Sequence, residues 1–401
     1  TGATVDTQHI FKYNGDSADI IIAYADAEVS MTAPGAGDWL PATTATIEVN
    51  DPNLNKNPLS AEALEIGNST HTIPTIKMGT PLTLANSGTN TSLSKADAGA
   101  TTGVTVGHDK GSEKYTLKVF NTTDNSERLR IIHSAVDAGI GANTHIWINV
   151  TTGHTRTTLV DLEGTTVLNY DISGPAGLVD STAVEVYLTD SGSNTTNGAD
   201  GLLKLLTSGN TRAGVLDLDE AGAAGANELG KNTSVTAVDD FSHVGTAGTS
   251  LMSVAFKITH AAGDKLLASE DYAIAADFCN FDQNNGSLTH NCIYRLEAVE
   301  TGDNTGVFEG TVEYINLNNS TANGTISGEH DGGDQEVEGL LGYIKGDALT
   351  VVLMDAVSGS DSVRVVYNDT DAFQVATKIG AQLETSTHTA DVSLDADSNG
   401  A

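Results

Sequence analysis

The sequence is poor in basic residues, in aromatics and in long apolar runs. It has 19 Lys and Arg against 53 Asp and Glu, so its formal net charge is −34 over 401 residues. A field of that sign repels phosphate backbones and anionic lipid, so we expect neither nucleic acid nor a membrane surface as a partner. No stretch approaches 18 consecutive apolar residues, and we expect no segment to insert into a membrane. With 5% aromatic and 39% hydrophobic residues, the chain is lean for a large enzyme with one deep core.

Proline is also scarce, with seven residues against 42 glycines. The polar bulk is Thr, Ser, Asn and Asp, which favour strands and turns over helices. Residues 1–30 lack the basic and apolar regions of a signal peptide, and the first residue is Thr1. We interpret the chain as a mature protein or as a segment of a longer one.

Cysteine is limited to Cys279 and Cys292, which enclose a short polar loop. Their pairing would close a loop of about 14 residues, worth about 3 kcal/mol in the chain-entropy model. Two free thiols are the alternative, whereas zinc would need more ligands than His290 alone supplies. We predict a disulfide, which favours an oxidising compartment.

Asparagine occurs unusually often in the Asn-X-Ser/Thr pattern of glycosylation acceptors. There are eleven such triplets, where composition predicts about six by chance. Thr-rich loops without sugar are the alternative, but together with the cysteine pair the triplets favour an exported glycoprotein. The candidate acceptors are Asn68, Asn90, Asn121, Asn149, Asn194, Asn232, Asn285, Asn318, Asn319, Asn323 and Asn368.

Internal comparison reveals a repeat. Residues 115–126 align without gaps on residues 294–305, and Tyr, Leu, Thr, Asp and Asn coincide. A second pattern, apolar and mixed positions in alternation before a Tyr and an Asp, occurs as Ile20–Asp26, Val184–Asp190 and Val363–Asp369. Such alternation predicts a strand with one buried face.

A further shared element begins 21 to 28 residues after the tyrosine of each of these strands. It occurs as Ala45–Asn55, Val215–Asp219 and Val392–Gly400. We therefore predict two full units, 31–195 and 196–375. Residues 1–30 would be the last strand of a preceding unit and residues 376–401 the start of a following one.

The fold class that these patterns predict is all-β. Turn clusters at 301–306, 328–334 and 358–361 separate alternating segments at a spacing typical of β-sandwiches. Residues 220–229 form the one candidate short helix, with an irregular loop as the alternative. The predicted strands are Lys114–Phe120, Leu129–His133, His145–Val150, Leu251–Thr259, Cys292–Val299, Val307–Ile315, Glu336–Ile344 and Ala348–Met354.

Four runs of residues also carry a family resemblance. The runs Glu300–Thr311, Gly346–Val351, Val363–Asp369 and Asp51–Asn55 resemble repeated Ig-like domains of surface-layer (S-layer) proteins from ammonia-oxidising archaea. The resemblance is full over 290–375 and 19–57, weaker over 115–190, and poorest over 56–112 and 200–290. It implies tandem Ig-like β-sandwich domains in a glycosylated, cation-associated subunit of a lattice that covers the cell.

Two Asp-rich turns match the first half of a calcium loop, whose ligands alternate along a tight turn. After Asp51, Glu62 stands at the twelfth position, but Lys56 occupies the place of the usual glycine. An Asx-rich turn without metal is the alternative, and Asp303, Asp331 and Asp334 are expected to be solvated. The candidate ligands for calcium or another divalent cation are Asp51, Asn53, Asn55 and Glu62, then Asp217 and Asp219, then Asp395, Asp397 and Asn399.

Catalytic motifs are not found. The eleven histidines show no metal-ligand spacing, and neither a nucleophile elbow nor a phosphate-binding loop occurs. Trp39 and Trp147 could stack on sugars, but core packing is the better interpretation. We therefore expect no catalytic site and no cofactor besides structural divalent cations.

The function that these observations favour is structural self-assembly at the cell surface. Copies of the chain would pack into a porous sheet whose acidic faces bind divalent cations and enrich small cations, with ammonium implied by the resemblance alone. The alternatives are an adhesin or filament subunit, a non-catalytic β-sandwich part of a secreted carbohydrate-active enzyme, and a halophile protein whose charge reflects salt adaptation.

Overall fold

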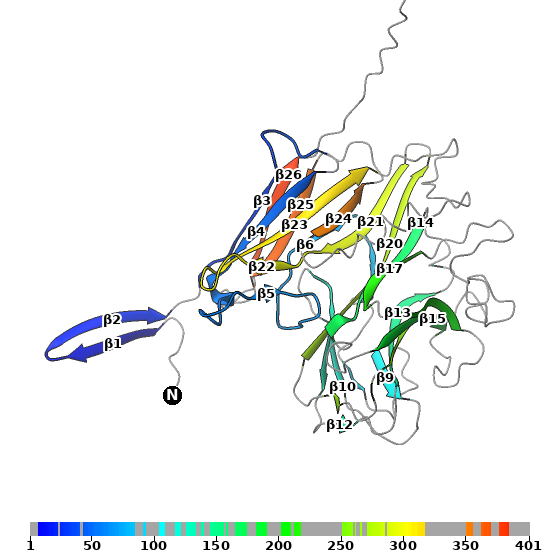
Figure 1. Ribbon diagram of the computed structural model, residues 1–401, viewed down its shortest axis with the longest axis horizontal. Coiled ribbons are helices and arrows are strands. Elements are labelled where there is room, and N and C mark those ends of the chain that lie inside the picture. Colours follow the sequence, from blue (N-terminus) through cyan, green and yellow to red (C-terminus); the bar gives the residue numbers. More distant parts are fainter. Residues whose placement is uncertain are drawn as a thin grey trace, which may run out of the picture.

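The computed structural model (Figure 1) describes about half of the chain. Within some of the described strands it defines the backbone alone. The described residues are 7–22, 25–40, 43–84, 91–93, 104–108, 117–121, 126–133, 138–139, 145–155, 158, 165–174, 182–190, 202–209, 212–217, 251–259, 261, 265–266, 271–284, 287–316, 350–355, 362–369 and 377–384.

The prediction of an all-β fold is confirmed. The described elements are 26 strands and one 3-10 turn, η1 (Pro52–Leu54). Burial alternates along β4 (Thr44–Asn50), where every second residue is buried, as expected of a strand with one face on a core.

One six-stranded sheet forms the first layer of a sandwich. Its order is β3-β4-β23-β22-β5, with β24 beside β23. All pairs are antiparallel except β23–β24, which is parallel. Besides β4, its strands are β3 (Glu28–Thr32), β5 (Ala63–Leu64), β22 (Ala298–Glu300), β23 (Val307–Asn316) and β24 (Thr350–Asp355).

The second layer is one end of an eleven-stranded sheet. Its strands there are β26 (Thr377–Glu384), β25 (Ser362–Asp369), β6 (Thr75–Met78) and β21 (Ser287–Arg295), in that order. Ile47 and Val312 of the first layer pack in one core with Tyr294 and Val365 of the second. These two layers form the first sandwich.

Trp39 belongs to the same core, which confirms the core-packing interpretation for this tryptophan. Its side chain is fully buried, and its indole N–H donates to the carbonyl of Thr43 at 2.8 Å.

A second pair of layers lies at the other end of the eleven-stranded sheet. The Tyr170 and Phe256 rings, from β14 and β18, lie 5.8 Å apart and join this part of the sheet to a five-stranded sheet. The five-stranded sheet has the order β16 (Leu202–Gly209), β15 (Ala183–Asp190), β18 (Leu251–Thr259), β13 (His145–Thr155) and β9 (Val104–His108). The facing strands are β20 (Asp271–Asn284), β14 (Thr165–Asp171), β17 (Ala213–Asp217), β11 (Leu129–His133), β10 (Leu117–Asn121), β8 (Thr91–Leu93) and β7 (Leu82–Thr83).

The long strand β20 connects the two sandwiches. It pairs with β21 on the side of the first sandwich and with β11 and β14 on the side of the second. Strands of the predicted unit 31–195 therefore pair with strands of the predicted unit 196–375, as β13 also does with β18. Strands on either side of residue 195 are thus hydrogen-bonded to one another in the same sheets. The short strands β12 (Ala138–Gly139) and β19 (Lys265–Leu266) add a separate two-stranded sheet.

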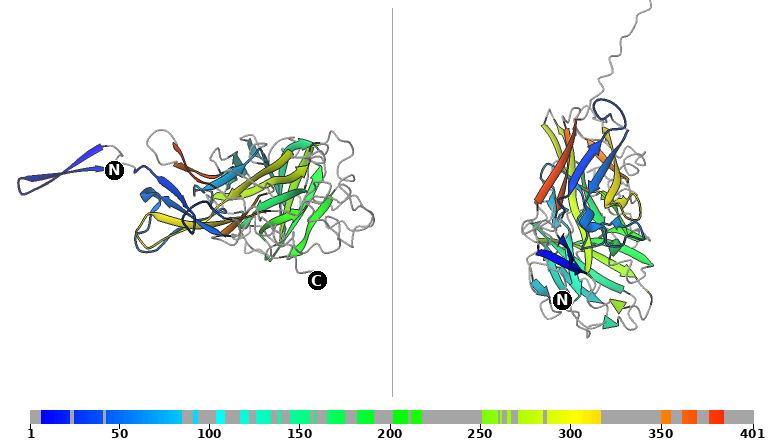
Figure 2. Two further views of the ribbon diagram at one scale, coloured as in Figure 1. Left: turned by 90° about the horizontal axis from the view of Figure 1, so that it is seen from above. Right: turned by 90° about the vertical axis from the view of Figure 1, so that its left-hand side faces the viewer.

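The N-terminal strands β1 (Thr7–Tyr13) and β2 (Asp16–Ile22) form a hairpin that projects away from the two sandwiches (Figures 1 and 2). Asn14 and Gly15 connect them with φ values of 52° and 93°. A two-residue Asn-Gly turn with both φ values positive is the type I′ turn that suits the twist of a hairpin.

The predicted strand positions agree well with the structure where it describes them. The segments 129–133 and 251–259 are strands with the predicted limits, and 184–190 and 363–369 lie in β15 and β25. Residues 220–229 and 336–344 lie outside the described residues.

The prediction of one strand over 292–299 is wrong. The chain leaves the eleven-stranded sheet after Arg295 and enters the six-stranded sheet at Ala298. Between them, the Leu296 N–H donates to the Pro74 carbonyl at 2.9 Å. Both halves alternate in the same way, so the pattern alone does not show the change of sheet.

Candidate functional site

The turn after β4 holds the first group of predicted calcium ligands. Asp51 caps η1, and its Oδ1 accepts the Asn53 N–H at 3.0 Å. This is the local Asx turn that Asp favours, since its short side chain reaches the backbone two residues on. Pro52 occupies the first helical position, where a missing N–H costs no hydrogen bond.

The second oxygen of Asp51 connects this turn to a distant strand. The Tyr367 hydroxyl of β25 donates to Asp51 Oδ2 at 2.8 Å, and both residues are 1% exposed. The two motifs that the sequence repeats, Asp51–Asn55 and Val363–Asp369, are therefore in direct contact. The contact joins the two layers of the first sandwich at one end.

A linker clamp, formed by Asn53 and Asp369, holds residues 25–27 next to this contact. The Asn53 side chain accepts the Ala25 N–H at 3.2 Å and donates to the Ala25 carbonyl at 2.8 Å. Asp369 Oδ2 accepts the Ala27 N–H at 3.1 Å. Both side chains thus bind the segment that precedes β3 through its backbone.

Glu300 organises the turn between β22 and β23. Its Oε1 accepts the N–H groups of Thr305 at 2.8 Å and Gly306 at 2.7 Å, and its Oε2 accepts the Glu62 N–H at 3.2 Å. Burial acts to raise the pKa of Glu300, but these hydrogen bonds outweigh it and lower the pKa below its ordinary value. The carboxylate is therefore held in its charged form by the backbone of the turn.

The two turns pack on each other through glycine. The Asp51 N–H donates to the Gly306 carbonyl at 2.8 Å, and Gly306 has φ +64°. A Cβ at this position would lie 2.8 Å from Pro52 Cα. A residue with a side chain therefore fits neither the backbone conformation nor the space.

The remaining predicted ligands of this group also accept or donate hydrogen bonds. Both carboxylate oxygens of Glu62 accept the Lys56 N–H at 3.0 Å, and the Asn55 amide donates to Asn304 Oδ1 at 2.8 Å. Hydrogen bonds already engage side-chain oxygens of three of the four predicted ligands, namely Asp51, Asn53 and Glu62. The geometry fits the Asx-turn alternative, and calcium binding stays a prediction.

Among the described residues, no three His, Cys, Asp or Glu side chains gather into a group that could hold a metal ion. Asp217 is the last residue of β17, opposite Val167 of β14. Asp219, Asp395, Asp397 and Asn399 lie outside the described residues. Asp303, predicted to be solvated, is exposed.

Two of the eleven candidate glycosylation sites have described side chains. Asn68 is partly exposed, and its Oδ1 accepts both the N–H and the hydroxyl of Thr70 at 3.0 and 2.8 Å. Asn368 in β25 is 6% exposed, so a sugar there would require this side chain to become exposed. Asn121 and Asn149 are strand positions, and the other seven sites (Asn90, Asn194, Asn232, Asn285, Asn318, Asn319, Asn323) lie outside the described residues.

The buried Arg128 side chain shapes the loop that carries Asn68. Its guanidinium donates to the carbonyls of Ile66 at 2.6 Å and Asn68 at 2.9 Å, and also to that of His71. Five fixed N–H donors make Arg suited to binding several carbonyls at once. The loop that presents Asn68 is thereby tied to the core.

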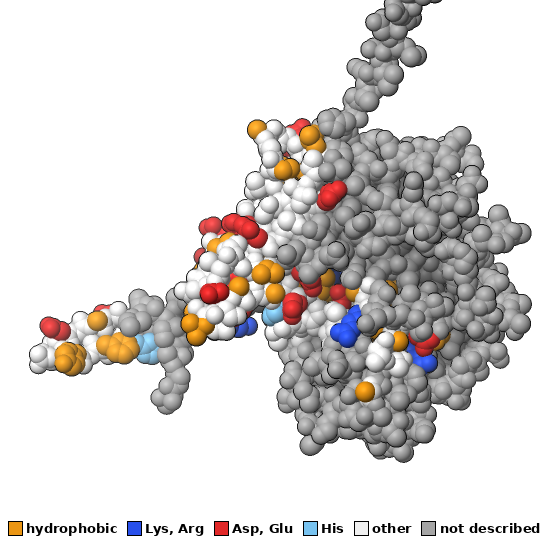
Figure 3. Space-filling model, viewed as in Figure 1, with side chains coloured by type: hydrophobic (Ala, Val, Ile, Leu, Met, Phe, Trp, Pro, Cys, Tyr) orange, Lys and Arg blue, Asp and Glu red, His pale blue; other side chains and the backbone are white. Residues whose placement is uncertain are grey.

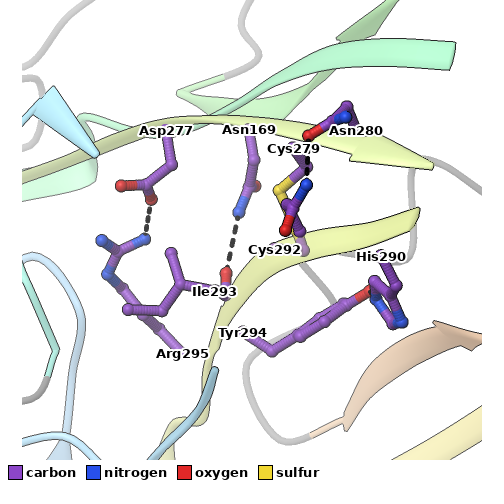
Figure 4. The surroundings of a disulfide bond; sticks show 10 residues. Asn169, Asp277, Cys279, Asn280, His290, Cys292, Ile293, Tyr294 and Arg295 are labelled. Carbon is purple, nitrogen blue, oxygen red and sulfur yellow. Dashed lines mark hydrogen bonds and ion pairs between the residues drawn. A yellow bond between two sulfur atoms is a disulfide. The ribbon is translucent and has the colours of Figure 1, made fainter. Parts of the chain in front are cut away.

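The predicted disulfide between Cys279 and Cys292 is confirmed (Figure 4). The two residues lie on β20 and β21, their Cα atoms are 4.5 Å apart, and both are fully buried. This separation is typical of directly opposed residues in a non-hydrogen-bonded antiparallel pair. The bond therefore ties β20, the strand that connects the two sandwiches, to β21 of the first sandwich.

Polar side chains surround the disulfide on both strands (Figure 4). Arg295 forms a buried ion pair with Asp277, and the Asn291 amide donates to Asn280 Oδ1 at 3.0 Å. Burial raises the pKa of Asp277, and the Arg295 guanidinium opposes that rise. On the other side His290 Nε2 lies 2.8 Å from the Tyr294 hydroxyl, and burial lowers the pKa of His290 to about 3.

Neither the organising role of Glu300 and Arg128 nor the Asp277–Arg295 ion pair was predicted from the sequence. Glu300 stands directly before the Thr-Gly-Asp turn. This position could have indicated a carboxylate that accepts hydrogen bonds from the backbone of the turn. Arg128, Asp277 and Arg295 carry no local signal, because their partners lie far away in the sequence.

The site as a whole is a set of interlocked turns at the end of the first sandwich. Comparison with known protein families and with curated proteins finds no match for this chain. No helix in the part of the chain that the structure describes is long and apolar enough to cross a membrane.

Proposed function

We propose that this chain is a structural subunit of an extracellular S-layer, built from Ig-like β-sandwich units and assembled from many copies. The observation that supports the proposal is that residues of the repeated motifs form hydrogen bonds between neighbouring turns and strands. Asp51, Asn53, Glu300, Tyr367 and Asp369 bind backbone and side chains of neighbouring turns and strands. Such residues stiffen joints between elements, as a subunit that must keep its shape in an assembly requires.

The net charge supports a role for cations in the assembly. Acidic faces that approach one another repel, and divalent cations between them remove that repulsion. Electrostatic enrichment of small cations extends about 8 Å from the surface at physiological salt. In the proposed sheet it therefore acts inside narrow pores.

The disulfide supports a location outside the cell, because buried disulfides persist in oxidising compartments. The Asn68 triplet supports the proposed glycosylation, since it lies on a partly exposed loop with a defined shape.

The test is electron microscopy of the purified 401-residue chain with calcium and after chelation. We expect extended sheets with calcium and their dissolution by EDTA, while circular dichroism keeps its strand signal. EDTA already saturated with calcium is the matched control and should leave the sheets intact. Sheets that survive EDTA would rule out the cation bridges, and the absence of sheets under all conditions would rule out the lattice.

A filament subunit is the second candidate function. The projecting β1–β2 hairpin favours it, since an arm that reaches one neighbour suits a fibre as well as a sheet. Fibres in the same micrographs would identify this alternative. A catalytic domain in a longer gene product would instead identify a secreted carbohydrate-active enzyme.

A further inference from the structure

The strands of the six-stranded sheet carry acidic residues but no lysine or arginine. Along β3, β4 and β23 the residues alternate between the core and the outer face, and the carboxylates lie on the outer face. Acidic side chains are visible over the first sandwich in Figure 3. The acidic face of this sandwich is formed by Glu28, Glu48, Glu309 and Glu313.

The strand register brings two of these carboxylates directly opposite each other. Glu48 of β4 is the register partner of Glu309 of β23, and Glu313 lies four residues further along β23. Like charges at opposed positions on one face of a sheet are destabilising. The ion pairs within the described part of the chain do not include these carboxylates. The six-stranded sheet therefore supplies no counter-charge of its own.

The outer face of the other layer of this sandwich carries three basic residues, which form the basic face. Lys77 of β6, Arg364 of β25 and Lys378 of β26 are all exposed, and their strands are neighbours in the sheet. One step beyond the register pair of Val365 and Ile76, Arg364 and Lys77 stand side by side. Positive charge is thus gathered on three adjacent strands.

The Arg364 side chain lies across this face over a glycine. A Cβ at Gly380 of β26 would lie 2.7 Å from Arg364 Nε and 3.0 Å from Nη2. The missing side chain therefore leaves the space that the guanidinium occupies. Two acidic residues are also near, because Glu127 forms an ion pair with Lys77 and Glu384 is exposed at the end of β26. Three basic against two acidic side chains leave this face positive, on a chain with a net charge of −34.

We propose that the acidic face of one copy of this chain packs against the basic face of a second copy, with Glu48 and Glu309 opposite Arg364 and Lys378. The choice of a second copy follows from charge complementarity, since one chain carries both surfaces, and it rests on the proposed self-assembly. Within one copy the two faces point away from each other on opposite sides of the sandwich, so they cannot neutralise each other. Complementary charges fix which surfaces meet and disfavour contacts between like faces.

A contact between two different faces is heterologous, so each copy has a neighbour on either side and copies add in a row. Strands such as β4, with seven residues, are about 23 Å long, and four strands are about 19 Å wide, so a face covers on the order of 400 Å². Stable interfaces bury about 800 Å² on each partner. One contact is therefore weak and reversible. It needs no divalent cation, because Arg and Lys supply the positive charge.

The test is sedimentation velocity of the full chain over a concentration series, with EDTA present to remove cation bridges. The variant Arg364→Glu/Lys378→Glu reverses the charge of the basic face. Lys12→Glu/Lys56→Glu is the matched control, because it changes the net charge equally at exposed positions outside both faces. We expect wild type and control to self-associate alike, and the reversed variant to bind at least about tenfold more weakly. Circular dichroism confirms that each variant is folded.

A second variant identifies the surface that the basic face binds. Glu48→Gln/Glu309→Gln/Glu313→Gln removes charge from the acidic face and should weaken self-association as well. A mixture of this variant with Arg364→Glu/Lys378→Glu should form 1:1 dimers that grow no further, because each variant keeps one of the two faces intact. A mixture without such dimers would show that the two faces do not bind each other.

A wild-type chain that stays monomeric would overturn the proposal and leave each face to a different partner. Equal association of the face variants and the control would overturn it too. The outcome is separable from the proposed function. Sheets formed by Arg364→Glu/Lys378→Glu refute this contact alone, whereas 1:1 dimers in the mixture without sheets of the wild type refute the lattice alone.

Discussion

At the scale of single residues, the acidic side chains fall into two groups with different roles. Asp51, Glu300 and Asp369 are buried and accept hydrogen bonds from turns, a strand and the linker. Hydrogen bonds to the charged form offset the cost of burying a carboxylate. Exposed residues such as Asp303 make no such contribution and supply the charge of the surface.

Histidines with a lowered pKa, among them His71 and His290, give the stability of the fold a pH dependence. Burial lowers the pKa of His290 to about 3, and burial with the nearby charges of Lys56 and Arg128 lowers that of His71 to about 4. Both remain neutral in the fold but take up protons on unfolding below their ordinary value of 6.5. Stability therefore falls as the pH decreases below 6.5, by at most about 1.4 kcal/mol per pH unit for each histidine.

Urea unfolding between pH 7.5 and 5 measures this dependence. We expect His290→Gln to reduce the slope of stability against pH, since one of the histidines with a lowered pKa no longer titrates. Comparison of slopes removes the contribution of the carboxylates, which both proteins share. An unchanged slope would show that His290 does not titrate differently in the two states.

At the scale of elements, the turns determine how strands of different sheets meet. In the turn after β22, the Glu300 carboxylate accepts backbone N–H groups of the turn, and Gly306 permits the close contact with Pro52. The change of sheet at Leu296 and the hairpin turn at Asn14–Gly15 are likewise local features with long-range effects. Strand alternation predicts the strands, and the turns decide which sheet each strand enters.

The change Gly306→Ala should lower the free energy of unfolding by about 2–4 kcal/mol. A left-handed backbone costs a residue with a side chain about 1–2 kcal/mol, and the contact with Pro52 adds overpacking. Gly302→Ala is the matched control in the same turn, because its Cβ would meet only the Thr305 methyl at 3.4 Å. Equal losses for both variants in urea unfolding would contradict this account of Gly306.

At the scale of the whole molecule, the two sandwiches share one long sheet. Strand β20 pairs toward both, and the disulfide and the Asp277–Arg295 ion pair fix it to β21. Unfolding one sandwich removes a neighbour from β20 and exposes the core beside it. We therefore expect the two halves to unfold together.

The two tryptophans report on the two halves separately. Trp39 lies in the core of the first sandwich, and Trp147 is a residue of β13 in the second. Fluorescence of Trp147→Phe and of Trp39→Phe should give coincident urea transitions, as a two-state process requires. Separate midpoints, once corrected for each variant's own stability, would show that the sandwiches are independent.

The sequence by itself was sufficient for the all-β class, for most strand positions and for the disulfide. These depend on local alternation and on two cysteines that have no other partner nearby. It also located the motifs of the candidate site, but as metal ligands, since the spacing of Asp51, Asn53 and Asn55 does not show which donors will reach them.

Only the tertiary structure decided which distant residues are hydrogen-bond partners. The Tyr367 hydroxyl reaches Asp51 over 316 positions, and Asp369 reaches Ala27 over 342. The role of the two cysteines is also visible only in the structure, because Cys279 lies on β20, which connects the two sandwiches, and Cys292 lies on the adjacent β21. Local periodicity is encoded by neighbouring residues, whereas pairing between distant strands depends on the packing of the whole chain.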